Sequence, residues 1–258
     1  MSLVTLLRAE DLFDSLKTEE GQPTRIPEVK PNSTLEAIVR KFERLLNQRS
    51  YVDPYHKSVF LLSPRFKEKV SADDVEQFSL LLARYQDHSS FFSRTGSFIS
   101  ALVNTSPDAE FRVHTRSLEP FYLSHLGHAN VKQLRIIGNA GSDLGEYMTK
   151  GKIVVEGNAM ASLADHLRGG EIEVEGDIVM SEKHEGFPLF MLGGTIRIQG
   201  NVDAIIRAPF IGEMHIAGDY HSMQISRISE IKEAECRIYH KGKLLVKGIT
   251  VYGGRHVE

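Results

Sequence analysis

One eight-residue pattern constrains this chain more than any other feature, because it recurs with the same alternation of side chains. The copies are GKIVVEGN at 151–158, GEIEVEGD at 170–177, GTIRIQGN at 194–201 and GEMHIAGD at 212–219. Apolar and mostly β-branched residues alternate with polar ones, which is typical of a half-buried β-strand. Each copy ends in Gly-Asn or Gly-Asp, a pair that tolerates positive φ and marks a turn. The sequence therefore predicts one strand and one turn in each copy.

The spacing of the copies predicts how these strands are joined. The glycine before Asn or Asp recurs at steps of 19, 19, 24 and 18 residues, at Gly138, Gly157, Gly176, Gly200 and Gly218. Steps of this length are typical of a solenoid. A hairpin array would need a second strong alternating strand in each unit, and the intervening segments contain none. We therefore expect the coils of a parallel β-helix, with like strands stacked about 4.8 Å apart.

The segments between the copies also keep register. Counting back from the first glycine of each copy aligns two apolar columns, which we expect to face the core. The first column is Leu144, Leu163, Phe187 and Ile205, and the second is Met148, Leu167, Met191 and Pro209. The longer third unit carries its extra residues around 181–188, which predicts a loop that projects from one coil.

The stretch GNAGSDLGEYMTKGKIVVEGNAMASLADHLRGGEIEVEGD, residues 138–177, resembles the glycine-rich (GXGXG) repeat domain at the C-terminal end of the glutamate synthase large subunit. It is similar also to one of the subunits of formylmethanofuran dehydrogenase. The resemblance covers about residues 131–219 and implies a right-handed parallel β-helix that serves as a scaffold between catalytic domains or subunits. It implies no catalytic residue. The family's second glycine in each coil is present at Gly145 but replaced by Ala164, Pro188 and Ile206, which predicts wider or irregular later coils.

The first 105 residues differ in kind, because their apolar residues follow a helical period. A short helix at 10–17 and an extended, proline-containing segment at 19–32 are expected first. Ser33 begins the capping box STLE, which predicts a helix that ends near Ser50. The apolar face expected for this helix is Leu35, Ile38, Phe42, Leu45 and Leu46.

Two further helices and a strand are expected next. Ser71 with the acids Asp73 and Asp74 opens the second helix, because hydroxyl and acidic side chains suit a helix N-terminus. A third helix is expected over 91–103, and the alternation of EFRVHTR at 110–116 predicts a first strand. The state of 51–65 is left open. The apolar stripe expected for the second helix is Val75, Phe78, Leu81, Leu82 and Tyr85.

These elements define an α+β fold class. The segment NTSPD at 104–108 is the clearest boundary, so we predict an N-terminal α-helical region at 1–105 followed by a right-handed parallel β-helix, or β-solenoid, at 106–258. Near the end, GKLLVKG at 242–248 is a weak echo of the repeat. Because the open ends of a solenoid need cover, our hypothesis is that the N-terminal helices cover one end or flank.

Composition limits the function classes. The formal net charge is −3, so no overall field recruits nucleic acid or an anionic membrane. Cys236 is the one cysteine, which excludes an internal disulfide and suits a reducing compartment. No apolar run reaches the roughly 18 residues of a membrane-spanning helix, and no signal-peptide cleavage pattern follows the first residues. We therefore predict a cytoplasmic protein without a membrane span or a nucleic-acid partner.

Three local patterns resemble ligand-binding sites: a glycine-rich stretch, a pair of histidines and a charged segment that contains His184. Gly138, Gly141 and Gly145 are spaced GxxGxxxG rather than GxGxxG, so a corner of the solenoid is favoured over a phosphate loop. His125 and His128 can share a metal only if another donor arrives, for which His114 and Glu119 are candidates. Surface or capping histidines are commoner, and His184 with its neighbouring acids favours a solvated loop. We predict no bound metal, no cofactor and no identifiable catalytic residue.

The outer face of the stacked strands offers an interaction surface. Register places Val154, Glu173, Arg197 and His215 in one column and Lys152, Glu171, Thr195 and Glu213 in another. Lys152–Glu171 and Glu173–Arg197 then become cross-strand neighbours of opposite charge, each contributing a few tenths of a kcal/mol. This face is either a solvated surface or an interaction face for a partner protein. The interaction face is defined by Lys152, Glu171, Glu173, Arg197 and His215.

The sequence favours a non-catalytic scaffold or protein-interaction module, built on the β-helix and docking a protein partner. An enzyme that acts on a polar ligand or polymer along an outer groove is the first alternative. The second is a structural subunit of a redox complex, which rests on fold analogy. The lack of a CxxC motif and of a dinucleotide fingerprint argues against an autonomous redox enzyme, and the absence of tryptophan argues against a carbohydrate enzyme.

Overall fold

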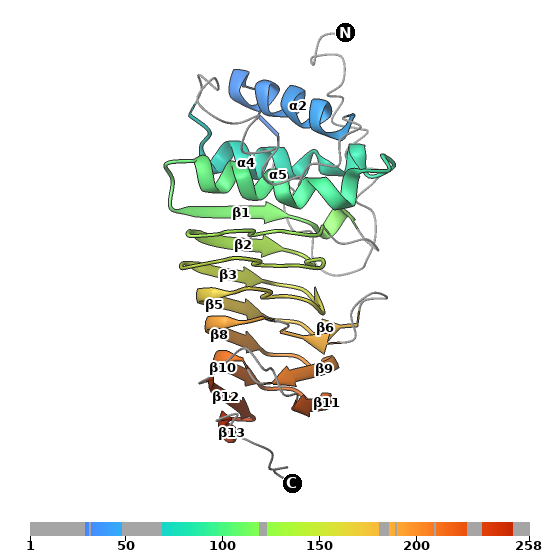
Figure 1. Ribbon diagram of the computed structural model, residues 1–258. Coiled ribbons are helices and arrows are strands. Elements are labelled where there is room, and N and C mark those ends of the chain that lie inside the picture. The colour runs from blue at the N-terminus through green and yellow to red at the C-terminus, as the bar shows by residue number, and fades with distance from the viewer. Residues whose placement is uncertain are drawn as a thin grey trace.

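The computed structural model describes residues 29–30, 32–47, 69–118, 123–180, 186–188, 190–208, 210–225 and 234–249. The predictions for 10–17 and for most of 19–32 lie outside these residues, as does 51–65, for which no state was predicted. Of the loop predicted around 181–188, residues 181–185 lie outside them, and Gly186 and Phe187 form the short strand β7. Helices α2 (Ser33–Leu46), α4 (Ala72–Leu80) and α5 (Phe91–Thr105) come first and strands follow, so the described fold is α+β as predicted (Figure 1).

Helix α2 begins one residue earlier than the sequence predicts. Its N-cap is Asn32, whose side chain accepts a 2.7 Å hydrogen bond from the Leu35 N–H, so Ser33 is already helical and the predicted capping box is wrong. The helix ends at Leu46 rather than near Ser50. Its predicted apolar face is correct and gains Val39, since the buried residues are Leu35, Ile38, Val39, Phe42, Leu45 and Leu46.

Helix α4 begins as predicted. Ser71 and Asp74 form a reciprocal capping box, in which each side chain accepts from the other residue's N–H. The helix ends at Leu80, and the last part of the predicted stripe continues in the 3₁₀ helix Leu82–Tyr85. Helix α5 confirms the third prediction. Aromatic contacts join the three helices into one core: the centroid of the Phe42 ring lies 5.2 Å from that of Phe78 and 5.3 Å from that of Phe98.

The strands form two sheets, neither of which is closed. The larger sheet has eight strands in the order β1-β2-β3-β5-β8-β10-β12-β13, and every neighbouring pair is parallel except β12–β13. The strands of the larger sheet are β1 (Glu110–His114), β2 (Gln133–Ile137), β3 (Lys152–Val155), β5 (Arg168–Val174), β8 (Leu192–Ile198), β10 (Ile211–Ile216), β12 (Ala234–His240) and β13 (Lys243–Ile249).

The smaller sheet has five strands in the order β11-β9-β6-β4, with β7 also paired to β9. Along the chain from β3 to β12, the strands belong alternately to the larger and the smaller sheet, apart from the short β7. The strands of the smaller sheet are β4 (Ala159–Met160), β6 (Ile178–Val179), β7 (Gly186–Phe187), β9 (Val202–Ala208) and β11 (Tyr220–Ile225).

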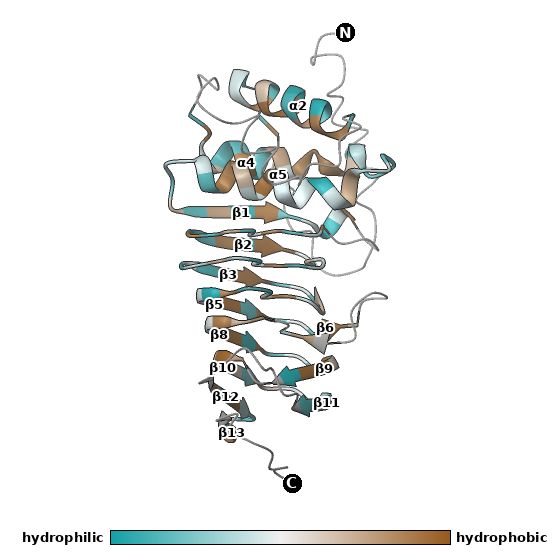
Figure 2. Ribbon diagram, viewed as in Figure 1, coloured by the Kyte–Doolittle hydropathy of each residue, from teal (hydrophilic) through white to brown (hydrophobic). Residues whose placement is uncertain are grey.

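The core between the sheets follows the predicted columns with one shift. Alternating hydrophobic and hydrophilic positions run along the strands (Figure 2). Leu144, Leu163 and Phe187 are fully buried, but the next member of this column is Ile206 rather than Ile205, because Phe187 pairs with Ile206. The extra residues of the third unit lie between β6 and β7, because Ile178 pairs with Val202 and Gly186 already pairs with Ile205. Met148, Leu167 and Met191 are buried as predicted, and Pro209 lies outside the described residues.

Of the five glycines before Asn or Asp, Gly138 has the predicted positive φ, at 127°, and the other four do not. Positive φ occurs at the glycine that opens each copy, such as Gly151 at 85° and Gly170 at 87°. Gly157, which precedes Asn158, has no positive φ; its Cα hydrogen instead faces Asn139 Oδ1 and Gly138 O so closely that a Cβ would collide with both. At this position glycine is needed for the close approach of successive corners.

The two ends of the larger sheet are covered differently. At one end α4 lies against β1, where Ser79 Oγ accepts from the His114 N–H at 3.0 Å and Asp108 accepts from the Ala72 N–H at 2.7 Å (Figure 1). At the other end, the predicted echo of the repeat at 242–248 is an antiparallel hairpin strand, β13, that follows a turn at Lys241. Among the described residues, no helix has the length and apolar character needed to cross a bilayer.

Candidate functional site

The outer face of the larger sheet carries two polar columns in the predicted register. Glu171 pairs with Lys152 and with Thr195, and Glu173 pairs with Val154 and Arg197. Both columns extend further than the sequence indicated, through β1 and β2 at one end and β12 at the other. The first column is Glu110, Gln133, Lys152, Glu171, Thr195, Glu213 and Arg237, and the second is Arg112, Arg135, Val154, Glu173, Arg197, His215 and Tyr239.

Ion pairs form both between neighbours in one column and between residues of the two columns. Lys152 Nζ lies 3.3 Å from Glu171 Oε1, which confirms the predicted pair, and 2.6 Å from Glu173 Oε2. Glu173 and Arg197 are cross-strand neighbours as predicted. The Arg197 Nε donates a 3.1 Å hydrogen bond to Glu171 Oε1, the same oxygen that Lys152 Nζ approaches at 3.3 Å. Both carboxylates of β5, Glu171 and Glu173, therefore have cationic partners on the same face.

These contacts shift the acid–base behaviour of the face in consistent directions. The hydrogen bond from Lys152 lowers the pKa of Glu173, and the same bond raises the pKa of Lys152. The hydrogen bond from His215, at 3.2 Å, lowers the pKa of Glu213. Because all of these side chains are partly exposed, water screens the pairs and each contributes only a few tenths of a kcal/mol.

The interaction face remains accessible. Its five predicted members all lie on the outer side of β3, β5, β8 and β10, and none of their side chains is fully buried. The His215 ring stacks on Tyr239, with ring centroids 4.5 Å apart and an interplanar angle of 6°. The face therefore combines charges of both signs with one aromatic stack.

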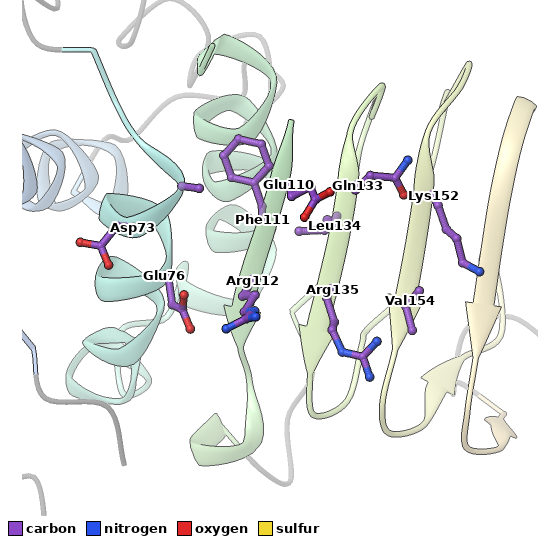
Figure 3. A pocket seen from close by; sticks show the side chains of 11 residues that line it. Asp73, Glu76, Glu110, Phe111, Arg112, Gln133, Leu134, Arg135, Lys152 and Val154 are labelled. Atoms are coloured by element: carbon purple, nitrogen blue, oxygen red, sulfur yellow. The ribbon is translucent and has the colours of Figure 1, made fainter. Parts of the chain in front are cut away.

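A cleft of about 420 Å³ opens where this face meets α4. Figure 3 shows Arg112 and Arg135 on neighbouring strands, with Asp73 and Glu76 of α4 beside them. Sequence reasoning missed this cleft, although EFRVHTR had marked β1 as a strand with Arg112 on one side. What the sequence could not indicate is that α4 lies against β1. The lining residues are Ala72, Asp73, Glu76, Glu110, Phe111, Arg112, Gln133, Leu134, Arg135, Lys152 and Val154.

A second constellation forms around the two histidines of the HLGH segment. His125 Nδ1 lies 3.1 Å and His128 Nδ1 lies 3.0 Å from the same oxygen, Glu146 Oε2. Of the two donors considered from sequence, His114 instead pairs with Glu76 at 3.0 Å, and Glu119 lies outside the described residues. The third group, Glu146, had been missed.

Glu146 is held in its ionised form. Burial opposes ionisation, but hydrogen bonds from His125 and then His128 outweigh it and lower the pKa of Glu146 to about 2. The Glu146 side chain is 18% exposed and that of His128 10%, so this charged group lies beneath the surface. A half-buried carboxylate between two imidazoles, with a strongly lowered pKa, marks this cluster as a candidate functional site.

Two other local features match the favoured interpretations. The described residues between β2 and β3, which include Gly138, Gly141 and Gly145, contain turns and no helix, so the arrangement of a phosphate loop is missing there. Cys236 is buried, and burial raises the pKa of its thiol, which opposes the reactive thiolate form. No family model, curated protein or solved structure matches the chain in the three comparisons made with known proteins.

Proposed function

We propose that this chain is a non-catalytic scaffold, built on a right-handed parallel β-helix, that docks a partner protein on the outer face of the larger sheet. Support for the β-helix comes from the alternation of successive strands between two sheets with parallel pairing up to β12. The likeness to the glycine-rich repeat domain of glutamate synthase supports a scaffolding role in the same sense, as an analogy of fold.

The observation that carries the docking proposal is the outer face of β1 to β12, on which the two columns are polar at every position except Val154. Its charges are ordered along the stack: Arg112 and Arg135 lie at the α4 end, and Glu171 and Glu173 lie at its middle. Two strand spacings separate Arg135 from Glu173, which is about 10 Å. The expected partner is a folded protein surface that presents acidic groups toward Arg112 and charges of both signs toward the middle of the face, where Glu171 and Glu173 pair with Lys152 and Arg197.

Photo-crosslinking locates the docking face. A photoreactive residue in place of Val154 lies at the centre of the face, and the same residue in place of Asp203, an exposed position of β9, is the matched control on the other sheet. Expressed in the native host, the variant at 154 is expected to yield a discrete protein adduct and the variant at 203 none. Adducts of equal yield at both positions, or at 203 alone, contradict the proposal.

A charge swap then tests the order of the charges. The double variant Lys152→Glu/Glu173→Lys keeps two cations and two carboxylates among positions 152, 171, 173 and 197. The like charges that it places opposite each other on partly exposed positions should cost only a few tenths of a kcal/mol each, so the melting temperature should stay close to that of the wild type. Affinity for the crosslinked partner is expected to fall at least tenfold. The control swap is Lys241→Asp/Asp219→Lys, an exposed pair 2.6 Å apart and outside the two columns. Equal affinities of both double variants contradict docking on this face.

The cleft beside α4 favours a second candidate function, the binding of a polar ligand. Arg112 and Arg135 are the cationic groups that would hold a carboxylate or phosphate, because guanidinium groups bind such anions with directed hydrogen bonds. At Arg135 the ligand must compete with Glu156 and Glu175, which lie 2.8 and 3.3 Å from its guanidinium nitrogens. A thermal-shift screen with carboxylated and phosphorylated metabolites tests this candidate. A stabilising compound should lose its effect with Arg112→Ala and keep it with Arg237→Ala, which lies on the same face but does not line the cleft.

A further inference from the structure

Three potential metal ligands converge at one point outside the sheet faces. One ring nitrogen of His125, one ring nitrogen of His128 and a carboxylate oxygen of Glu146 all lie within 4.8 Å of one another. Both imidazoles face the same carboxylate oxygen, at 3.1 and 3.0 Å. Among the residues that the structure describes, this is the one group of at least three His, Cys, Asp or Glu side chains with such convergence.

The backbone builds this arrangement from two stacked loops. In the HLGH turn, His125 and Gly127 have positive φ, and the His128 N–H donates to His125 O at 3.4 Å, so both imidazoles leave the turn on one side. The following loop stacks beneath it in parallel, with the Ala129 N–H donating to Glu146 O at 2.7 Å. This bond places Glu146 next to the HLGH turn. The backbone that carries the three side chains is therefore fixed by hydrogen bonds within the turn and between the two loops.

A layer of polar groups positions the histidines from behind. Ser100 of α5 donates its hydroxyl to His125 O at 2.9 Å and accepts from the His128 N–H at 3.2 Å. Asn104 donates to His128 O at 2.9 Å. Asp143 lies 3.8 Å from His125 Nε2, the ring nitrogen that does not face Glu146. Histidines that bind metal through one ring nitrogen usually donate the other N–H to a carboxylate, and at 3.8 Å Asp143 lies just beyond hydrogen-bond distance of this nitrogen.

The distances fit a small tetrahedral ion. Zinc binds imidazole nitrogen and carboxylate oxygen at about 2.0–2.1 Å, so two ligands of a tetrahedral site lie about 3.3 Å apart. The two N···O separations of 3.1 and 3.0 Å are slightly shorter than this edge, so a small outward movement of the carboxylate accommodates the ion. Two imidazoles and one carboxylate also leave a fourth position for water or for a ligand.

We propose that His125, His128 and Glu146 form a binding site for a divalent transition-metal ion of the zinc class, with Asp143 as a positioning residue for His125. The nitrogen-rich donor set favours zinc, cobalt or copper over magnesium and calcium, which prefer oxygen ligands. The competing explanation is a purely structural triad, in which both imidazoles donate hydrogen bonds to Glu146 and no ion enters. This proposal is independent of docking on the sheet face.

Metal titration of the full chain, purified without a histidine tag and treated with a chelator, separates the two explanations. Zinc is added in competition with a chromophoric chelator, and one equivalent should bind. Glu146→Gln and His128→Asn should each weaken zinc binding at least tenfold, and Asp143→Asn should weaken it less. The control His215→Asn removes a histidine from another His–Glu pair, 3.2 Å apart, and should leave zinc binding unchanged. Loss of binding in His215→Asn equal to that in Glu146→Gln overturns the proposal.

Cobalt binding can be measured on the wild-type chain, so this test does not depend on whether the variants fold. Tetrahedral Co²⁺ with nitrogen and oxygen ligands absorbs visible light far more strongly than the octahedral aqueous ion. One equivalent of Co²⁺ added to the wild-type chain should produce this absorption, and one equivalent of Zn²⁺ should abolish it. An unchanged spectrum, together with failure to compete for zinc, overturns the proposal and leaves the hydrogen-bonded triad as the explanation of the cluster.

Discussion

Asn139 Oδ1 accepts a 2.7 Å hydrogen bond from the backbone N–H of Asn158, the equivalent corner residue of the next repeat. The same bond recurs from Asp177 to Asn158 at 2.8 Å, from Asn201 to Asp177 at 2.6 Å and from Asp219 to Asn201 at 2.9 Å. Each corner side chain thus satisfies an N–H that the strand pairing leaves without a partner. This ladder explains why the repeats end in Asn or Asp.

Replacement of Asn158 by alanine should destabilise the fold by about 1 kcal/mol, because the partly buried N–H of Asp177 loses its acceptor. Asn158→Asp is the matched control. It keeps an acceptor oxygen, as Asp177 does in the next corner, and should cost no more than about 0.5 kcal/mol from the added like charge. Urea denaturation measures both differences. Equal losses in the two variants would show that the acceptor oxygen is not what matters.

Gly157→Ala should be more costly, at about 3 kcal/mol, because the new methyl group meets Asn139 Oδ1 and backbone oxygen that cannot withdraw. Gly242 provides the contrast. It has a φ of 75° but no neighbouring atom within 4 Å of an added Cβ, and asparagine tolerates this conformation. Gly242→Asn should therefore cost about 0.5 kcal/mol or less. Comparable urea midpoints for the two variants would contradict the role of close approach at Gly157.

The N-cap of α2 offers a test between two adjacent residues. Asn32→Ala removes the acceptor of the Leu35 N–H and should cost about 1 kcal/mol. Ser33→Ala should change stability by less than about 0.5 kcal/mol, because Ser33 lies inside the helix. Chemical denaturation of both variants checks the order. A larger loss for Ser33→Ala would restore the capping box that the sequence predicts.

The strand register was predictable because it depends on local alternation. The apolar positions Ile153 and Ile172 are both fully buried and pair directly, as their equivalent places in the repeat require. A one-residue slip would turn both side chains to solvent, so the pattern specifies the register strongly. The N-cap of α2 was missed because Asn32, a favoured N-cap residue, is followed by Ser33 and Glu36, which offer a competing capping-box pattern. The bond from Asn32 to Asp74, 42 residues away, has no signature in the local sequence that would decide between them.

The candidate sites were predictable only in part, for the same reason. His125 and His128 are recognisable as a pair from their spacing, but Glu146 joins them through the stacking of two irregular loops that precede the first complete copy of the repeat. The cleft requires Glu76 of α4 to lie beside Arg112 of β1, which depends on how the helices pack against the sheet. Neither arrangement follows from periodicity.

Tyr85 links α2 to the 3₁₀ helix that follows α4 and should make stability depend on alkaline pH. Burial raises the pKa of Tyr85 above its ordinary value of 10.0, and the Glu43 carboxylate, which accepts its hydroxyl at 3.0 Å, raises it further. The folded state therefore keeps the proton where the unfolded chain loses it. The contribution of the protonated Tyr85 hydroxyl to the free energy of unfolding is complete below about pH 10 and is lost as pH rises above that value.

Tyr85→Phe isolates this contribution, because every other titrating group is common to both proteins. The difference in free energy of unfolding between wild type and Tyr85→Phe should shrink above about pH 10, by less than the limiting 1.4 kcal/mol per pH unit because water screens the half-buried Tyr85. Urea denaturation of both proteins at neutral pH and at about pH 11 measures the change. A difference that stays constant over this range would show that Tyr85 ionises equally in the folded and unfolded states.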